Sequence, residues 1–116
     1  MSDILERAKE HFAAYRARPV AVPEWPDDDG NPTEVFVKPL TLSAKRILDK
    51  KHGDDIQARM VTIVIRHVVD ADDKPIFSDS DEPVLLSAVS GAVLERLALA
   101  ASGINLDELI GIAEKN

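Results

Sequence analysis

The chain has 116 residues, of which 45% are hydrophobic and only 4% aromatic, so we expect one domain whose core consists mainly of Leu, Ile, Val and Ala. It contains no cysteine, which excludes disulfides, thiolate metal sites and cysteine nucleophiles. A net charge of −7 argues against binding to nucleic acid, because phosphate-binding faces concentrate Lys and Arg. The chain does not open with a charged-then-apolar signal peptide. These properties predict an acidic, soluble, intracellular protein.

The N-terminal segment, residues 2–17, has the pattern of an amphipathic helix that ends before Pro19. Its apolar side chains recur at spacings of three, four and three, and form one stripe: Leu5, Ala8, Phe12 and Tyr15. Such a stripe is more often a core face than a partner-binding seam, because it is too short to establish a heptad repeat. We therefore expect it to face the core, with partner binding as the alternative.

A β-hairpin is predicted next, because two short β-branched runs flank a segment rich in turn-forming residues. The runs are Val20–Val22 and Val35–Val37, and the tip extends from Pro26 to Thr33. Trp25, the only tryptophan, lies where the first strand enters the tip. We expect Trp25 to anchor the hairpin on the helical body.

Two helices are predicted after the hairpin. The first, Leu42–His52, has Thr41 as N-cap and Gly53 as the residue that ends it. Asp54 or Asp55 then caps a helix that extends to about Val69 and is apolar around much of its circumference, which indicates packing on more than one side. Since its C-terminal half is β-branched, a change to strand near Val68 is an open alternative.

The C-terminal half begins with a polar turn. Asp70–Lys74 and the extended Pro75–Phe77 suggest a second small hairpin. Asp81 is placed to cap, and Pro83 to begin, one long buried helix that reaches Ala101 and ends at Gly103. Glu95 and Arg96 in the middle of this segment argue against a membrane span.

A short final helix is expected after Asn105, with an apolar inner face formed by Leu106, Leu109, Ile110 and Ala113. The predicted fold class is therefore α+β and mainly α-helical, a helical body with one or two small β-hairpins.

Residues suited to catalysis or metal binding do not form a recognisable pattern. The Asp70–Lys74 segment does not fit a calcium loop, because a lysine and a proline occupy positions that need a ligand and a glycine. His11 and His52 are read as exposed or helix-terminal residues, and His67 as a boundary residue on an apolar stripe. There is no G-x-S-x-G elbow, P-loop or G-x-G-x-x-G motif. We predict no enzymatic activity, no cofactor and no metal.

The order of several short motifs resembles the small tail assembly chaperones of long-tailed phages and prophages. These motifs are V-P-E-W at 22–25, V-K-P-L-T-L-S-A-K-R at 37–46, and the aspartate-rich I-R-H-V-V-D-A-D-D-K-P-I-F from residue 65. The resemblance covers nearly the whole chain. It departs from the family pattern in the long hairpin tip and at Asp73-Lys74, where Asp-Gly is usual.

The resemblance implies a non-enzymatic protein of the host cytoplasm that keeps the tape measure protein soluble and helps tail tube subunits assemble around it. It implies protein partners, with a homo-oligomer possible, and neither nucleic acid nor membrane. The alternative is a structural tail or head-tail connector component that stays in the virion. Apolar residues on the two terminal helices are the candidate partner-binding set: Leu5, Phe12, Tyr15, Leu106, Leu109 and Ile110.

Many members of the family are made in two lengths through a −1 ribosomal frameshift near the end of the short frame. Glu114-Lys115-Asn116 can be encoded by a slippery heptamer, so the resemblance raises the expectation that these 116 residues are the shorter product. An ordinary polar helix end is the alternative explanation.

Overall fold

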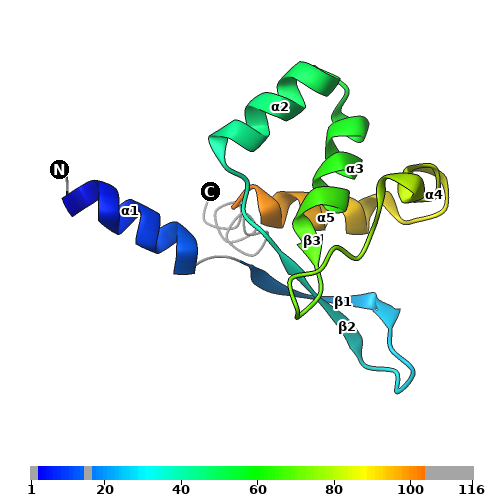
Figure 1. The fold of residues 1–116 in the computed structure, drawn as a ribbon. Helices are drawn as coiled ribbons and strands as arrows, with labels where there is room; N and C mark the ends of the chain where they lie inside the picture. Colours follow the sequence, from blue (N-terminus) through cyan, green and yellow to red (C-terminus); the bar gives the residue numbers. More distant parts are fainter. Residues whose placement is uncertain (1–2, 15–16, 104–116) are drawn as a thin grey trace, which may run out of the picture.

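The computed structural model describes residues 3–14 and 17–103. The elements follow in the order α1 (Asp3–Ala14), β1 (Arg18–Pro26), β2 (Pro32–Val37), α2 (Leu42–His52), α3 (Ile56–His67), β3 (Val68–Val69), α4 (Glu82–Ser87) and α5 (Gly91–Ala101). A short 3₁₀ turn, Asp79–Asp81, precedes α4. Figure 1 shows the helices gathered above a small twisted sheet, with α1 extending to one side. The predicted α+β, mainly helical class is confirmed.

The predicted hairpin is formed by β1 and β2, which pair antiparallel with Val20 opposite Val35 and Val22 opposite Thr33. Pairing is irregular between Val22 and Pro26, so the strand is bulged where it approaches the tip. Within the tip, one carboxylate oxygen of Asp27 accepts the backbone N–H groups of Asp29 and Asn31, both at 2.9 Å. An aspartate that bonds nearby backbone in this way stabilises a tight turn.

The third strand is short and follows α3 directly. Helix α3 ends at His67, and Val68–Val69 pair antiparallel with Val37 and Phe36 of β2. The alternative change to strand near Val68 is therefore correct, and the expected helical continuation to Val69 is wrong, because the β-branched pair gains a strand partner.

The second predicted hairpin is present in minimal form. A single antiparallel bridge joins Val69 to Pro75 across the Asp70–Lys74 turn. The Asp70 N–H donates to the Lys74 carbonyl at 2.9 Å, and the Asp70 carboxylate accepts the Asp72 N–H at 2.8 Å. Asp73 adopts a left-handed conformation with φ of 65°, which aspartate tolerates better than most residues other than glycine.

The helix boundaries around α2 and α3 agree with the cap residues in the sequence. The Thr41 hydroxyl accepts the Ala44 N–H, and the Asp55 carboxylate accepts the Ala58 N–H, both at 3.1 Å. Gly53, with φ of 56°, ends α2 and donates its N–H to the Asp49 carbonyl. Short polar side chains at these positions satisfy backbone donors that have no partner within the helix.

The predicted long helix ending at Ala101 is wrong, since the chain breaks it into α4 and α5. Between them the chain leaves the helical conformation at residues 88–90, where Val89 packs against the core. Asp81 is the N-cap residue of α4 and Pro83 lies in the first turn, as predicted, but the Asp81 side chain makes no capping bond to α4. Its carboxylate instead accepts the Ser78 N–H at 2.8 Å and closes the 3₁₀ turn before α4.

The core lies between the sheet and the helices α3 and α5, which pack against each other. Its most completely buried side chains are aliphatic and come from both layers: Val22, Val35, Val37, Val64, Val68, Val69, Val93 and Leu97. Trp25 is half-buried at the edge of this cluster, with its ring edge-on to Phe77 at a centroid distance of 6.3 Å. It joins the hairpin to the body, as predicted.

An ion pair reinforces the junction between the hairpin and α5. Two nitrogens of the Arg96 guanidinium donate to the two Glu24 carboxylate oxygens at 2.9 and 2.7 Å. Arg96 lowers the pKa of Glu24 below its ordinary value through this hydrogen bond. The Glu-Trp pair of the V-P-E-W motif therefore has a structural role, since Glu24 attaches the hairpin to α5 and Trp25 packs on Phe77 in the segment before the 3₁₀ turn.

Helix α1 contradicts the expectation of a core-facing stripe. None of its described residues is buried, and Leu5 and Phe12 are 56% and 44% exposed. In Figure 1 the helix extends away from the rest of the protein. Across the described ranges, no helix is long and apolar enough to span a membrane.

Candidate partner-binding surfaces

Within residues 3–14 and 17–103, no three His, Asp or Glu side chains are grouped so that they could hold a metal ion. The three histidines lie apart, on α1, at the end of α2 and at the end of α3. The surface features that remain are apolar residues exposed to solvent, and they concentrate on α1, α2 and α4. Exposed apolar patches typically mark sites of interaction with other proteins, so these surfaces are the candidate binding sites.

A groove lies between α2 and α3. The two helices join near Gly53 and diverge toward the sheet, as Figure 1 shows. The groove has a volume of about 340 Å³ and is lined by Ala44, Ile47, Leu48 and Lys51 from α2 and by Thr62, Ile63, Arg66 and His67 from α3. We call these eight residues the α2–α3 groove.

Helical spacing explains how α2 supplies half of the groove. Its four lining residues stand at i, i+3, i+4 and i+7, so they share one face of the helix. Two bonds between the helices hold their relative position. His52 Nε2 and Thr62 Oγ1 lie 2.8 Å apart, and the Arg59 guanidinium donates to the Asp49 carboxylate.

The groove combines apolar side chains with positive charge. Leu48 and Ile63 are buried, whereas Ile47 is 64% exposed at the edge. Lys51 and Arg66 are the charged residues of the lining, which includes no carboxylate. Arg66 reaches Asp79 at 3.3 Å, but both side chains are largely exposed, and such pairs contribute only about 0–1 kcal/mol.

His67 lies at the sheet end of the groove, where burial lowers its pKa below the ordinary value and a backbone hydrogen bond with Lys38 partly opposes this shift. Its Nδ1 atom is buried and has no hydrogen-bond partner among the described residues. Because burial favours the neutral imidazole, the positive charge of the groove comes from Lys51 and Arg66.

The groove was not predicted from the sequence. The available signal was the wide apolar surface of α3, which indicates packing on more than one side. The structure shows that one side of α3 packs on α5, while Ile63 and its neighbours also line the groove. Apolar residues at 44, 47 and 48 of α2 were the complementary signal, because they share a face with a lysine at its edge.

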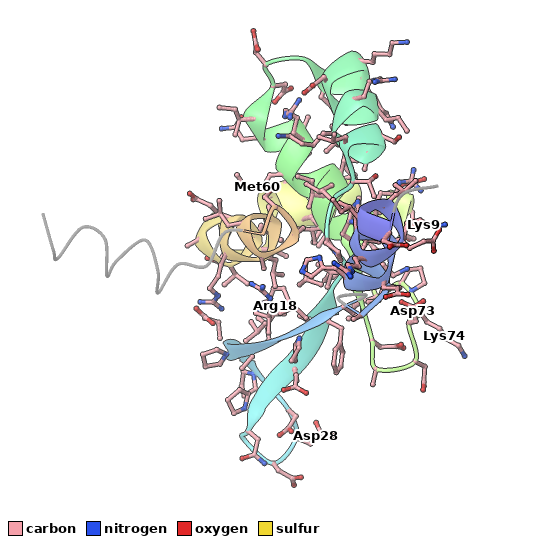
Figure 2. All side chains as sticks on the ribbon, turned by 90° about the vertical axis from the view of Figure 1, so that its left-hand side faces the viewer. Lys9, Arg18, Asp28, Met60, Asp73 and Lys74 are labelled. Carbon is pink, nitrogen blue, oxygen red and sulfur yellow. The ribbon has the colours of Figure 1, made fainter. Side chains whose placement is uncertain are left out.

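The predicted α1 surface adjoins one end of the α2–α3 groove. Phe12 lines a hollow of about 380 Å³ together with Lys38, Pro39, Arg66, His67 and Asp73. Figure 2 shows Lys9 of α1 pointing outward, with Asp73 and Lys74 on the turn below it. Leu5 and Phe12 are thus exposed on α1, whereas Tyr15, Leu106, Leu109 and Ile110 lie outside the described residues. Partner binding by all six stays a prediction.

The fold was compared with those of known proteins. No protein-family model matches the sequence, and no curated protein matches it. Among solved structures, the bacteriophage HK97 tail assembly chaperone superposes on 89% of this chain and 98% of its own, with a TM-score of 0.58 and 22% sequence identity. The resemblance noted in the sequence is therefore confirmed at the level of the fold. The chain shares its architecture with a phage tail assembly chaperone.

Proposed function

We propose that the protein is a single-domain, non-enzymatic tail assembly chaperone of a long-tailed phage or prophage. In this role it binds the tape measure protein in the host cytoplasm and helps tail tube subunits assemble around it. The similarity of fold to the HK97 chaperone over almost the whole of that protein is the observation that supports this proposal most strongly. The order of the V-P-E-W, V-K-P-L-T and aspartate-rich motifs along the chain adds to it.

The surface chemistry is compatible with this function. A long helical client exposes apolar stripes that aggregate unless another protein covers them, and an amphipathic helix typically binds in an apolar groove. The α2–α3 groove and the exposed α1 stripe offer such apolar surfaces. A net charge of −7 helps a complex of this kind remain soluble.

The test is co-expression of the tagged full-length chain with the tape measure protein encoded beside it in the same genome. We expect the tape measure protein to remain soluble and to co-purify with the chain, and to aggregate when the chain is omitted. A tape measure protein that is equally soluble alone and is not captured would contradict the proposal.

The rival function, a structural component of the tail or the head-tail connector, makes a different prediction. A chaperone leaves the particle, whereas a structural component stays in it. Mass spectrometry of purified virions therefore separates the two functions. Detection of this chain at a stoichiometry comparable with that of the tube or connector proteins would favour the structural component.

A further inference from the structure

We propose that the α2–α3 groove binds an amphipathic helix of a client protein, and that it selects helices whose apolar stripe is bordered by acidic side chains. The proposal rests on the proposed function in one respect only, namely that the helix comes from a client rather than from a second copy of this chain. It assigns a binding surface and a charge preference to that client.

The shape of the groove suits a few side chains of a helix. Its volume of about 340 Å³ is near the lower end of the 300–1,000 Å³ typical of ligand pockets, so it can take a short row of apolar side chains but not a whole helix. Helix-in-groove binding uses anchors spaced i, i+3 or i+4, and i+7. Leu48 and Ile63 provide an apolar floor for such anchors, and Ile47 provides an apolar edge.

Charge determines which helix fits. Residues 42–67 contain six Lys or Arg and three Asp, on a chain whose net charge is −7. The helical pair is therefore a local positive region of an acidic protein. Because the Debye length is about 8 Å at physiological ionic strength, a docked helix senses this local charge rather than the net charge. Lys51 and Arg66 border the apolar floor directly.

The ion pairs nearby leave these two cations available. Arg59 of the same region is engaged by Asp49, and it does not line the groove. Arg66 is paired with Asp79 only at the exposed surface, and a client carboxylate can replace Asp79 at little cost. An acidic border on the client helix would thus meet two cations and, within the groove lining, no repelling carboxylate.

Helix α1 of a second copy suits the groove less well. Its stripe, Leu5, Ala8 and Phe12, has the anchor spacing, but at 100° per residue the stripe is bordered by Ile4 and then His11 on one side and by Lys9 on the other. Glu6 and Glu10 lie toward the opposite face, and Glu6 pairs with Lys9 at 3.4 Å. A second copy would therefore bring a lysine to a basic border, which favours a client helix with acidic flanks.

The direct test measures binding of two designed peptides to the full-length protein by fluorescence anisotropy. Both peptides have leucines at helical anchor spacing, one with Glu and the other with Lys at all flanking positions. We expect the Glu peptide to bind at least about tenfold more tightly than the Lys peptide, a difference of about 1.4 kcal/mol. Equal affinities, or no binding of the Glu peptide, would overturn the proposal.

Variants locate the site. Ile47→Asp and the double variant Lys51→Glu/Arg66→Glu should each weaken binding of the Glu peptide about tenfold or more, and the double variant should gain affinity for the Lys peptide. Leu42→Asp is the matched control, because Leu42 is 84% exposed on the same helix and does not line the groove. Thermal unfolding checks that all variants are folded. A control that loses as much affinity as Ile47→Asp would refute the assignment.

The same variants separate this inference from the proposed function. If the Ile47→Asp chain still captures the tape measure protein as well as the parent does, the groove is not the client site although the function stands. If the Glu peptide binds in the groove but no variant or parent captures the tape measure protein, the proposed function fails and the groove assignment stands. If Ile47→Asp converts an oligomeric parent to monomers, a second copy occupies the groove and the inference is wrong.

Discussion

Helices α1 and α5 show how similar sequence patterns lead to opposite environments. Each is an amphipathic helix of about three turns, and α1 is the more strongly amphipathic of the two. Five residues of α5 are buried, namely Val93, Leu94, Leu97, Ala98 and Ala101, whereas no described residue of α1 is. A marked apolar stripe by itself therefore does not establish that a helix packs in the core of its own chain.

The difference reflects what surrounds each helix. Helix α5 contacts α3 as well as β1 and β2, so its stripe meets the valines of these strands in one core. Helix α1 is twelve residues long and none of its described residues is buried, and a helix of that length is only marginally stable by itself in water. Partner binding by Leu5 and Phe12 stays a prediction.

Truncating one leucine in α5 and one in α1 should give the largest difference in the free energy of unfolding. Leu97→Ala should lower the free energy of unfolding by about 2–5 kcal/mol, because Leu97 is 0% exposed and its loss leaves a cavity. Leu5→Ala should change that free energy by less than about 0.5 kcal/mol, as expected for an exposed position. Urea unfolding measures both. A loss for Leu5→Ala comparable with that for Leu97→Ala would show that α1 packs on the core in solution.

Much of the fold followed from local sequence signals. Thr41, Gly53 and Asp55 marked helix ends because cap residues act through bonds to adjacent backbone. The hairpin was predictable because β-branched runs and turn formers occur in order. The break between α4 and α5 did not follow from the apolar pattern, because the apolar residues that pack in the core recur every four positions from Leu85 to Leu97 and would share one face of an uninterrupted helix. The same pattern therefore fits one long helix and two short ones.

The candidate site was less predictable than the fold. The sequence directed attention to the terminal stripes, and four of those six residues lie outside the described part of the chain. The α2–α3 groove forms from two helices that diverge, and their angle depends on tertiary contacts such as His52 with Thr62. The basic composition of residues 42–67 can be counted in the sequence, but only the structure shows Lys51 and Arg66 beside apolar side chains.

Substitution of Trp25 measures how much a half-buried side chain at the edge of the core contributes to stability, between the buried Leu97 and the exposed Leu5. Trp25→Ala should lower the free energy of unfolding by up to about 3 kcal/mol, because the ring is half-buried and contacts Phe77. Truncating a fully buried tryptophan costs at least about that much. Trp25→Phe should recover part of this loss, since it retains an aromatic ring beside Phe77. Thermal unfolding of both variants provides the measurement. If Trp25→Ala melts within a degree or two of the parent, the indole is not an anchor.

The smallest expected effect concerns His67, which lies between the core and the α2–α3 groove. Burial and, to a lesser extent, the positive charge of Lys38 lower its folded-state pKa, whereas the pKa in the unfolded chain is about 6.5. Between these two pKa values the unfolded chain binds more protons than the folded chain does. The contribution of the neutral His67 to the free energy of unfolding is therefore complete above pH 6.5 and is lost as the pH falls through the folded-state pKa. His67→Gln should make the free energy of unfolding less dependent on pH just below 6.5. At lower pH, the decrease in this free energy that protonation of Glu24 causes should be the same in the variant and the parent. Urea unfolding across this range, with an NMR titration of the imidazole, checks the expectation. An unaltered slope, or an imidazole that titrates above 6.5, would place His67 outside the buried boundary of the core.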